Sequence, residues 1–185
     1  MAYKACFLDR LRNHFRHGGL IAYPTESCYG LGCNPDNAQA VKRLLRLKNR
    51  LQNKGLILIA DCFSRLRPYL APLTALQRQS VFATWPGPHT WLVPASRKTP
   101  RWLRGGYTTL AVRVSAHPDA AALCHALGSA LVSTSANRSG LKPIKTRAAC
   151  LKAFGNQVLV VPGRIGKHKK PSVIQDLTSG KIVRE

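Results

Sequence analysis

The sequence predicts an α/β fold in which helices cover a mixed β-sheet. Short apolar runs that are typical of buried strands alternate with amphipathic stretches of helical spacing. The region from residue 90 to residue 114 and the C-terminal segment 173–184 both have the form of antiparallel strand pairs, so the sheet is mixed rather than wholly parallel. A length of 185 residues corresponds to one domain, which we place at residues 1–185.

The first third of the chain contains two helices and two strands. Apolar residues recur at helical spacing over 5–17, and Gly18 and Gly19 end this helix. A short apolar strand over 20–23 ends at Pro24. Asn37 caps a helix that extends to residue 47, and Gly55 opens the buried strand 56–60. Both helices have one apolar side, formed by Phe7, Leu8, Leu11 and Phe15 in the first and by Ala40, Val41, Leu44, Leu45 and Leu47 in the second.

The remaining elements continue this alternation. A helix over 74–83 ends before Trp85-Pro86, and strands follow at 90–94 and 110–114. Pro118 begins a helix over 118–127 that Gly128 ends, and the strand 130–134 comes next. A short helix over 147–154, a strand over 158–161 and a hairpin that joins 173–177 to 182–184 complete the prediction.

The charge balance indicates a protein that binds anions. Lys and Arg number 29 against 7 Asp and Glu, which gives a formal charge of +22 spread along the whole chain. No apolar run approaches the roughly 20 residues that cross a bilayer, and charged residues interrupt the N-terminal segment where a secretion signal would lie. We therefore expect a cytoplasmic protein without a membrane segment.

Several familiar catalytic motifs are absent from the sequence. It contains no phosphate loop of the Gly-x-x-x-x-Gly-Lys-Ser/Thr type, no Gly-x-Gly-x-x-Gly fingerprint and no His-Glu-x-x-His pair. Its six cysteines include no Cys-x-x-Cys pair, so we expect no metal site in the protein. With seven carboxylates, any Mg²⁺ would be held mainly by substrate phosphates and water.

Polar residues that follow predicted strands or helices mark four candidate places for chemistry. Segment 24–32 combines hydroxyls, Glu26 and two glycines, and is otherwise an ordinary connection. Lys48, Arg50 and Lys54 suit a polyphosphate, although the helix dipole alone explains Lys48. Segment 133–140 can hold phosphate and ribose oxygens, or merely cap a turn. Arg113, within a strand, is either solvated or directed at a bound carboxylate.

A short basic run, residues 167–170, lies between Gly166 and Pro171. Such a run is typical of a mobile, solvated surface turn. It also suits a flap that faces a phosphate or an RNA.

The polar segments, taken together in order, resemble the YrdC-like family of threonylcarbamoyl-AMP synthases in its short single-domain form. The matching stretches cover the chain from about residue 20 to its C-terminus. They are Ala-Tyr-Pro-Thr-Glu at 22–26, Tyr-Gly-Leu-Gly at 29–32, Leu-Lys-Asn-Arg at 47–50, Lys-Gly-Leu-Ile-Leu-Ile-Ala at 54–60, Trp-Pro-Gly-Pro at 85–88, Leu-Ala-Val-Arg-Val at 110–114, Val-Ser-Thr-Ser-Ala-Asn-Arg-Ser-Gly at 132–140 and Pro-Ser-Val-Ile-Gln-Asp at 171–176.

The resemblance implies a twisted mixed sheet with helices on both faces and a large basic central cavity. It also implies synthesis of threonylcarbamoyl-AMP and pyrophosphate from L-threonine, bicarbonate or CO₂, and ATP with Mg²⁺. Partner proteins then transfer the threonylcarbamoyl group to the adenosine beside the anticodon of tRNA. The alternative class is a noncatalytic basic protein that binds double-stranded RNA or acts in ribosome maturation.

The same resemblance assigns roles to residues of this sequence. It places the catalytic cations at Lys48 and Arg50, and the threonine pocket at Thr25, Arg113 and Ser133. The implied nucleotide contacts are Arg50, Lys54, Thr109, Ser135, Asn137 and Ser172. Glu26 is a candidate acceptor for the amine proton.

Overall fold

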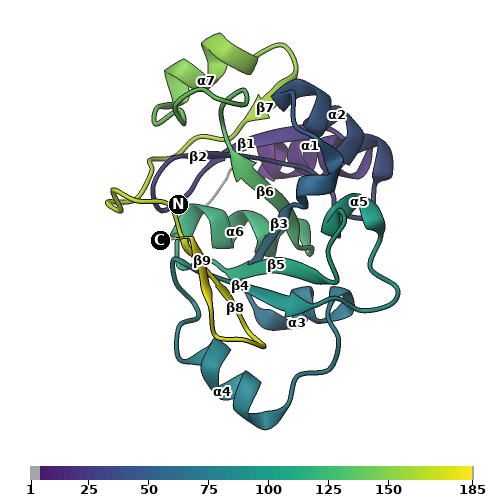
Figure 1. The fold of residues 1–185 in the computed structure, drawn as a ribbon. Coiled ribbons are helices and arrows are strands. Elements are labelled where there is room, and N and C mark those ends of the chain that lie inside the picture. The colour runs from purple at the N-terminus through teal and green to yellow at the C-terminus, as the bar shows by residue number, and fades with distance from the viewer. Residues whose placement is uncertain (1–4, 185) are drawn as a thin grey trace.

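Nine strands form the sheet in a computed structural model that describes residues 5–184. They are β1 (Leu20–Pro24), β2 (Tyr29–Gly32), β3 (Ile57–Ala60), β4 (His89–Pro94), β5 (Thr109–Val114), β6 (Leu131–Ser135), β7 (Val158–Val160), β8 (Val173–Asp176) and β9 (Ile182–Arg184). Their order across the sheet is β7-β1-β2-β6-β3-β5-β4-β8-β9 (Figure 1). The predicted single domain over 1–185 extends beyond the described residues at both ends.

The pairing of the strands confirms the predicted mixed sheet. Strands β4 and β5 are antiparallel, as are β8 and β9, in agreement with the two antiparallel pairs expected from the sequence. The pairs β1–β7, β3–β5 and β4–β8 are parallel. Parallel pairs bring together segments that lie far apart in the sequence, so the complete sheet forms only when both halves of the chain are present.

Seven α-helices cover the sheet over the described residues. They are α1 (Ala5–Arg16), α2 (Ala38–Lys48), α3 (Phe63–Leu66), α4 (Ala75–Phe82), α5 (Arg101–Arg104), α6 (Pro118–Leu127) and α7 (Arg147–Phe154). The caps follow the sequence: the Asn37 side chain accepts from the N–H of Ala40, and Thr74 forms a capping box with Gln77. The short helices α3 and α5 were not predicted, because four residues give no readable periodicity.

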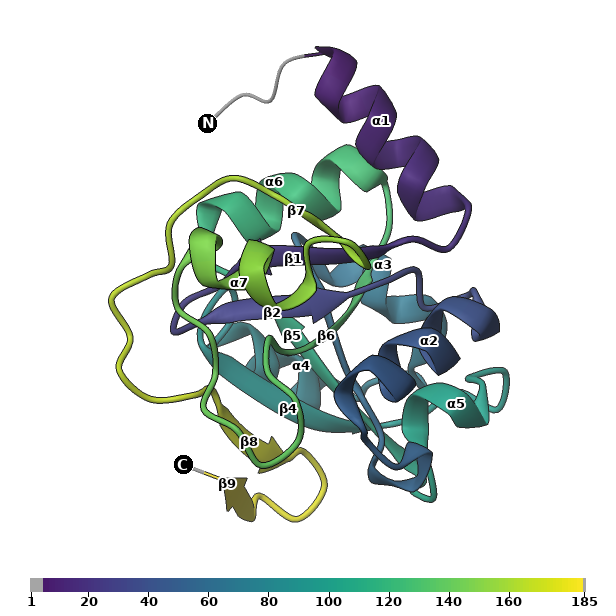
Figure 2. The ribbon, with the colours of Figure 1, turned by 90° about the horizontal axis from the view of Figure 1, so that it is seen from above.

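Both faces of the sheet carry helices (Figure 2). Alternate residues of a strand point to opposite faces, and all five residues of β1 are buried. Ile21 belongs to one apolar cluster with residues of α1 and α6, such as Phe15 and Leu123. Ala22 belongs to the other, larger cluster, which includes Leu44 of α2 and Phe154 of α7. The buried strand therefore separates two hydrophobic cores.

Strand β2 corrects the sequence prediction, which treated residues 24–32 as a connection. Tyr23 of β1 pairs with Gly30, and Ile21 with Gly32, in an antiparallel hairpin. Two glycines in four residues weaken a strand, which is why the pattern did not reveal it. The structure shows why glycine is needed, because a Cβ on Gly32 would collide with the carbonyl oxygen of Val132.

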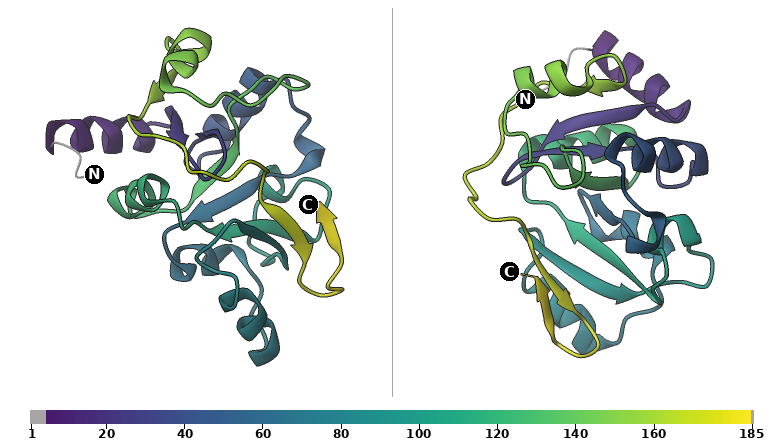
Figure 3. Two further views of the ribbon diagram at one scale, coloured as in Figure 1. Left: turned by 90° about the vertical axis from the view of Figure 1, so that its left-hand side faces the viewer. Right: turned by 45° about the horizontal axis from the view of Figure 1, so that its top comes forward.

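Strand β6 pairs with two partners along its length. Residues 131–133 pair with β3, whereas Thr134 and Ser135 pair with β2. The sheet therefore diverges at the C-terminal end of β6, between β2 on one side and β3 on the other (Figure 3). This divergence places the polar residues of segment 133–140 beside the segment that follows β1.

Within the described part of the chain, the helices are all too short or too polar to cross a membrane.

Candidate active site

A cavity of about 620 Å³ opens where the sheet diverges at β6. Its wall collects residues from six separate segments of the sequence. Six of the predicted site residues are among them: Thr25, Arg50, Arg113, Ser133, Ser135 and Ser172. The structure thus brings together the whole predicted threonine pocket and half of the predicted nucleotide residues.

A second hollow of about 250 Å³ adjoins the first. Lys54 and Thr109 line it, together with apolar residues such as Ile174 and the ring of Tyr107. Arg50 and Arg184 line both spaces. The two hollows are therefore neighbours, with two guanidinium groups at their junction.

Lys48 lies behind the cavity wall and is 3% exposed. Its ammonium group, at the end of α2, donates to the carbonyl oxygens of Ser135 (2.5 Å) and Asn137 (2.7 Å). The loop returns a bond to the helix, since the N–H of Ser139 donates to the carbonyl of Lys48 (2.9 Å). Lys48 therefore holds the loop after β6 in place, and its predicted direct contact with phosphate stays a prediction.

Asn137 is engaged within the same loop. Its Oδ1 accepts a hydrogen bond from the Ser135 hydroxyl (2.5 Å), and its Nδ2 donates to the carbonyl of Leu141 (2.7 Å). The Lys48 ammonium lies 3.4 Å from the same Oδ1. Lys48, Ser135 and Asn137 thus form one network, in which Ser135 is the member that lines the cavity.

In the free protein, we expect Lys48 to titrate far below an ordinary lysine. Burial, and then the charge of Arg50, lower the pKa of Lys48 from 10.5 to about 8. The unfolded chain therefore binds more protons between pH 8 and about 10.4, and Lys48's contribution to the free energy of unfolding rises with pH through that window. NMR of the lysine side chains, assigned with a Lys48→Arg variant, measures this pKa. A value near 10.4 would contradict the placement of Lys48.

Arg113 and Glu26 form a buried ion pair beside the cavity. Arg113 Nη2 lies 3.3 Å from Glu26 Oε2, and the side chains are 9% and 8% exposed. The Ser115 hydroxyl donates to Glu26 Oε1 (2.7 Å). Burial acts to raise the pKa of Glu26, but the Arg113 charge and the Ser115 hydrogen bond outweigh it and hold that pKa below its usual value. Glu26 is therefore an anion that holds Arg113, and this charge state makes it a weak acceptor for a substrate proton.

Three buried polar atoms around this cavity have no hydrogen-bond partner in the described structure: Arg50 Nε, Arg113 Nε and Glu26 Oε2. Buried polar groups are normally paired with protein atoms or with ordered water. An anionic ligand binds to hydrogen-bond donors that have no other partner, and Arg50 and Arg113 each have one such donor. Arg113 Nε suits a carboxylate, because Glu26 already occupies the other side of the guanidinium.

Residues 161–172 form a strap that runs past the cavity to β8, and Figure 2 shows it at the outer edge of the sheet. The N–H groups of Gly166 and His168 donate to the carbonyls of Thr25 (2.9 Å) and Glu26 (3.1 Å). All four residues of the basic run 167–170 are exposed, as expected of a solvated surface turn, and Lys169 also lines the cavity, so a flap that faces a phosphate or an RNA stays a prediction.

Arg184 of β9 is a site residue that sequence reasoning missed. Its Nη2 donates to the carbonyl (2.9 Å) and the hydroxyl (3.1 Å) of Ser172, whose hydroxyl also accepts from Thr90 (2.9 Å). Burial, and then the charge of Arg113, lower the pKa of Arg184. A single arginine in a terminal strand carries no sequence pattern. The parallel pairing of β4 with β8 is what brings it to the cavity.

The described residues contain no group of three or more His, Cys, Asp or Glu side chains arranged to hold a metal ion. The charged groups at the cavity are mainly cations: Arg50, Arg113, Lys142, Lys145, Lys169 and Arg184. The arrangement can bind an organic carboxylate and phosphates in adjoining places. It offers no cluster of carboxylates for metal chemistry of its own.

Comparison with known proteins gives consistent matches. Residues 13–185 match the family Sua5/YciO/YrdC, whose description reads "Telomere recombination". The chain is 60% identical over 174 residues to the threonylcarbamoyl-AMP synthase of Methylobacillus flagellatus, covering 94% of this chain and 97% of that protein. It is 58% identical over 174 residues to the protein of the same name from Thiobacillus denitrificans, covering 94% and 93%.

Two solved structures share the fold. Sua5 of P. abyssi, complexed with L-threonine, superposes with a TM-score of 0.88 at 28% identity over 98% of this chain. This chain covers 54% of that protein, so it spans about half of its length. YciO of E. coli superposes with a TM-score of 0.86 at 26% identity, covering all of this chain and 91% of that one.

Proposed function

Since this chain belongs to the Sua5/YciO/YrdC family, we propose that it is a threonylcarbamoyl-AMP synthase. Residues 1–185 would act as one domain, in the cytoplasm, on L-threonine, CO₂ or bicarbonate, and ATP. The proposal rests on two adjoining hollows. The buried Arg113 lines the larger one, and Arg50 and Arg184 lie at its junction with the smaller one. The noncatalytic RNA-binding alternative is not favoured, since the relatives of highest identity named above carry an enzyme's name.

The larger hollow is the proposed threonine site. Arg113 would bind the carboxylate of threonine through its unpartnered Nε. Thr25 donates its hydroxyl hydrogen to the carbonyl of Cys28 (2.7 Å), so its oxygen remains an acceptor for the threonine hydroxyl. Ser133, in the same wall, would complete this contact. The complex of P. abyssi Sua5 with L-threonine supports an amino-acid site in this fold.

The nucleotide would span the junction and the smaller hollow. Arg50, Lys54 and Arg184 would bind its phosphates, and the apolar wall near Ile174 and Tyr107 suits a base. Ser135, Thr109 and Ser172 would supply hydroxyl contacts, and Asn137 would act through the loop that it shares with Lys48. We propose that the two hollows together are the large basic central cavity expected from the sequence.

The proposed reaction forms two bonds in succession. The threonine amine adds to CO₂, which gives a carbamate and releases a proton. A carbamate oxygen then attacks the α-phosphorus of ATP, the bond to the β-phosphate oxygen breaks, and pyrophosphate leaves with its Mg²⁺, which enters as part of the nucleotide substrate. Arg50 would stabilise the charge that develops on the phosphates, and Lys48 would position the loop that lines the site.

The product is a mixed anhydride with the group for transfer already activated. We propose that partner proteins transfer this threonylcarbamoyl group to the adenosine beside the anticodon of tRNA. The cavity wall, which includes Lys169 of the strap, would limit the access of water to the anhydride until release.

The purified chain is expected to release pyrophosphate from Mg²⁺–ATP only when threonine and bicarbonate are both present. Coupled detection of pyrophosphate measures the rate, and omission of each substrate in turn is the control. Release that continues without threonine, or without bicarbonate, would contradict the proposed function.

A further inference from the structure

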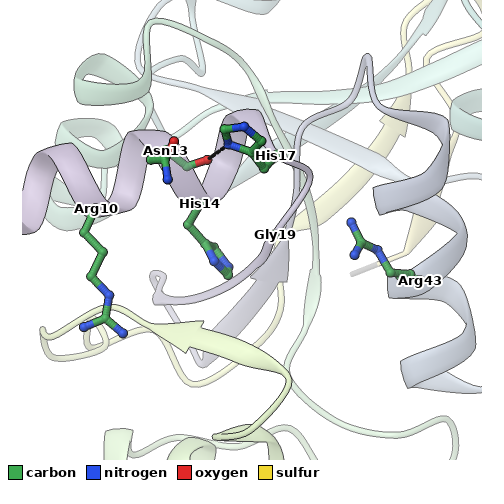
Figure 4. Close-up of a pocket in the computed structure, with 6 residues that line it drawn as sticks. All are labelled: Arg10, Asn13, His14, His17, Gly19 and Arg43. Carbon is green, nitrogen blue, oxygen red and sulfur yellow. Dashed lines mark hydrogen bonds between the residues drawn. The ribbon is translucent and has the colours of Figure 1, made fainter.

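A second basic region lies on the side of α1 and α2, apart from the catalytic cavity. Its first hollow, of about 400 Å³, is lined by Arg10, Asn13, His14, His17, Gly19 and Arg43 (Figure 4). A second hollow, of about 720 Å³, continues from Arg43 along α2 and is lined by Leu20, Arg43, Arg46, Leu47, Asn49, Arg138 and Gln157. We call these two hollows the α1–α2 track. The track shares no lining residue with the two hollows of the active site.

The side chains of the track are held in place. Arg43 Nη2 donates to the carbonyl of Gly18 (2.5 Å), so the guanidinium stands across the turn that follows α1. His14 donates from Nε2 to the carbonyl of Leu20 (2.8 Å), and His17 donates from Nδ1 to the carbonyl of Asn13 (2.9 Å). Figure 4 shows the rings and Arg43 around the turn at Gly19. A Cβ on Gly19 would collide with the His14 ring, so this glycine seats the histidine.

The arginines of the track have no acidic partners. None of Arg10, Arg43, Arg46 and Arg138 forms an ion pair with a carboxylate within residues 5–184. Helix α2 contains no acidic residue, and Asp9, the one carboxylate of α1, pairs with Arg12 (3.6 Å). The positive charge of this face is therefore uncompensated, and it is available to an anion from outside the protein.

The shape of the track identifies the kind of anion. Arg43 and Arg46 lie three residues apart on α2 and project from one side of the helix, and the charges continue to Arg10 in one direction and Arg138 in the other. A single phosphate would contact one part of this row, whereas a phosphodiester backbone presents regularly spaced charges along it. The track has no exposed aromatic side chain of the kind that anchors a protein partner, so an RNA backbone fits better than an acidic protein.

We propose that the α1–α2 track binds the phosphodiester backbone of RNA, as a surface separate from the catalytic cavity. The contacts are to phosphates, so they position the RNA without reading its bases. The inference does not rest on the proposed synthase activity, because none of its residues lines the active site.

The test compares two triple variants of equal charge. Arg10→Gln/Arg43→Gln/Arg46→Gln removes three cations from the track, and Arg67→Gln/Arg78→Gln/Arg97→Gln removes three exposed cations that line neither the track nor the two hollows of the active site. The probe is an unmodified tRNA transcript, with its dissociation constant measured by fluorescence anisotropy between 50 and 200 mM KCl, a range chosen because phosphate contacts weaken steeply there. The track variant is expected to bind more weakly, with a plot of log K against log salt that is flatter by about one unit for each contact removed.

Two further measurements separate charge from folding. The variant Arg10→Lys/Arg43→Lys/Arg46→Lys keeps the charge and is expected to keep most of the salt dependence. The thermal unfolding of the glutamine track variant, followed by circular dichroism, is expected to match that of the unaltered chain, which shows that the protein is folded whether or not it is a synthase. Pyrophosphate release by this variant is expected to stay near that of the unaltered chain, because none of the three residues lines the active site. Equal weakening by both glutamine triples would overturn the inference, since binding would then follow net charge alone. The inference would also be overturned if the track variant kept the slope of log K against log salt of the unaltered chain. The same holds if its substitutions abolished binding to an acidic protein but left binding to the tRNA transcript unchanged.

Discussion

An Arg113→Ala variant is expected to lose threonine binding almost completely. Removing one member of a buried charged contact costs about 2–5 kcal/mol. This corresponds to a rise in KM for threonine of roughly 30- to 5,000-fold. The KM for ATP should change far less, because the phosphates are assigned to Arg50, Lys54 and Arg184. Steady-state rates of pyrophosphate release against threonine concentration give the result.

The control for Arg113→Ala must account for Glu26. Without Arg113, the Glu26 carboxylate is a buried anion that keeps its hydrogen bond from the Ser115 hydroxyl but has lost its ion pair, and the loss of stability is expected to be about 3–5 kcal/mol. The double variant Arg113→Ala/Glu26→Gln removes this charge. It should recover much of the stability in urea denaturation while threonine binding stays lost. Recovery of activity in the double variant would show that Arg113 acts through Glu26 and does not bind the substrate.

An Arg50→Ala variant is expected to lower kcat by about 10²–10³ while it leaves the KM for threonine nearly unchanged. Arg50 lines both hollows, its Nη2 donates to the carbonyl of Gly55 (3.0 Å), and its Nε is buried without a partner. That fixed guanidinium would stabilise charge on the phosphates as pyrophosphate leaves. Single-turnover rates at saturating ATP and threonine measure the effect.

Two variants serve as controls for Arg50→Ala. Arg50→Lys keeps a point charge but not the planar fork, so an intermediate rate is expected. Arg78→Ala removes an exposed cation from α4 and should leave kcat as it is. If Arg50→Ala raised only the KM for threonine, the assignment of Arg50 to the nucleotide would be wrong.

Much of the architecture was predictable because the apolar pattern is strong. The helices α1, α2, α6 and α7 and most strands lie within a residue or two of their predicted positions, since capping residues such as Asn37 and stops such as Gly128 mark their ends. Strand β2 could not be found this way. Glycine is required at position 32 because the carbonyl oxygen of Val132 lies too close for a Cβ atom, and the sequence alone does not reveal this contact.

The composition of the site was predictable, but the use of each residue was not. Motif order identified Lys48, Arg50, Arg113 and Ser135, and most of the predicted residues meet at the two hollows. No motif shows that the Lys48 ammonium faces two backbone carbonyls, or that Glu26 holds Arg113. These contacts join residues far apart in the chain, and Ser115 with Glu26, 89 positions apart, is one case. Arg184 is hidden for the same reason.

The strap affects the order in which the elements of the protein fold during synthesis. It ties Tyr29 to Gly163, which are 134 positions apart, through the Tyr29 hydroxyl (2.7 Å), and β7 pairs in parallel with β1. During synthesis the β1–β2 hairpin therefore leaves the ribosome long before β7 is made and can pair with the edge of β1. Contacts between residues so far apart in the sequence also form slowly. Until β7 and the strap arrive, β1 presents an unpaired edge that invites association with other chains. Chaperone demand should accordingly be concentrated on intermediates that end before residue 158.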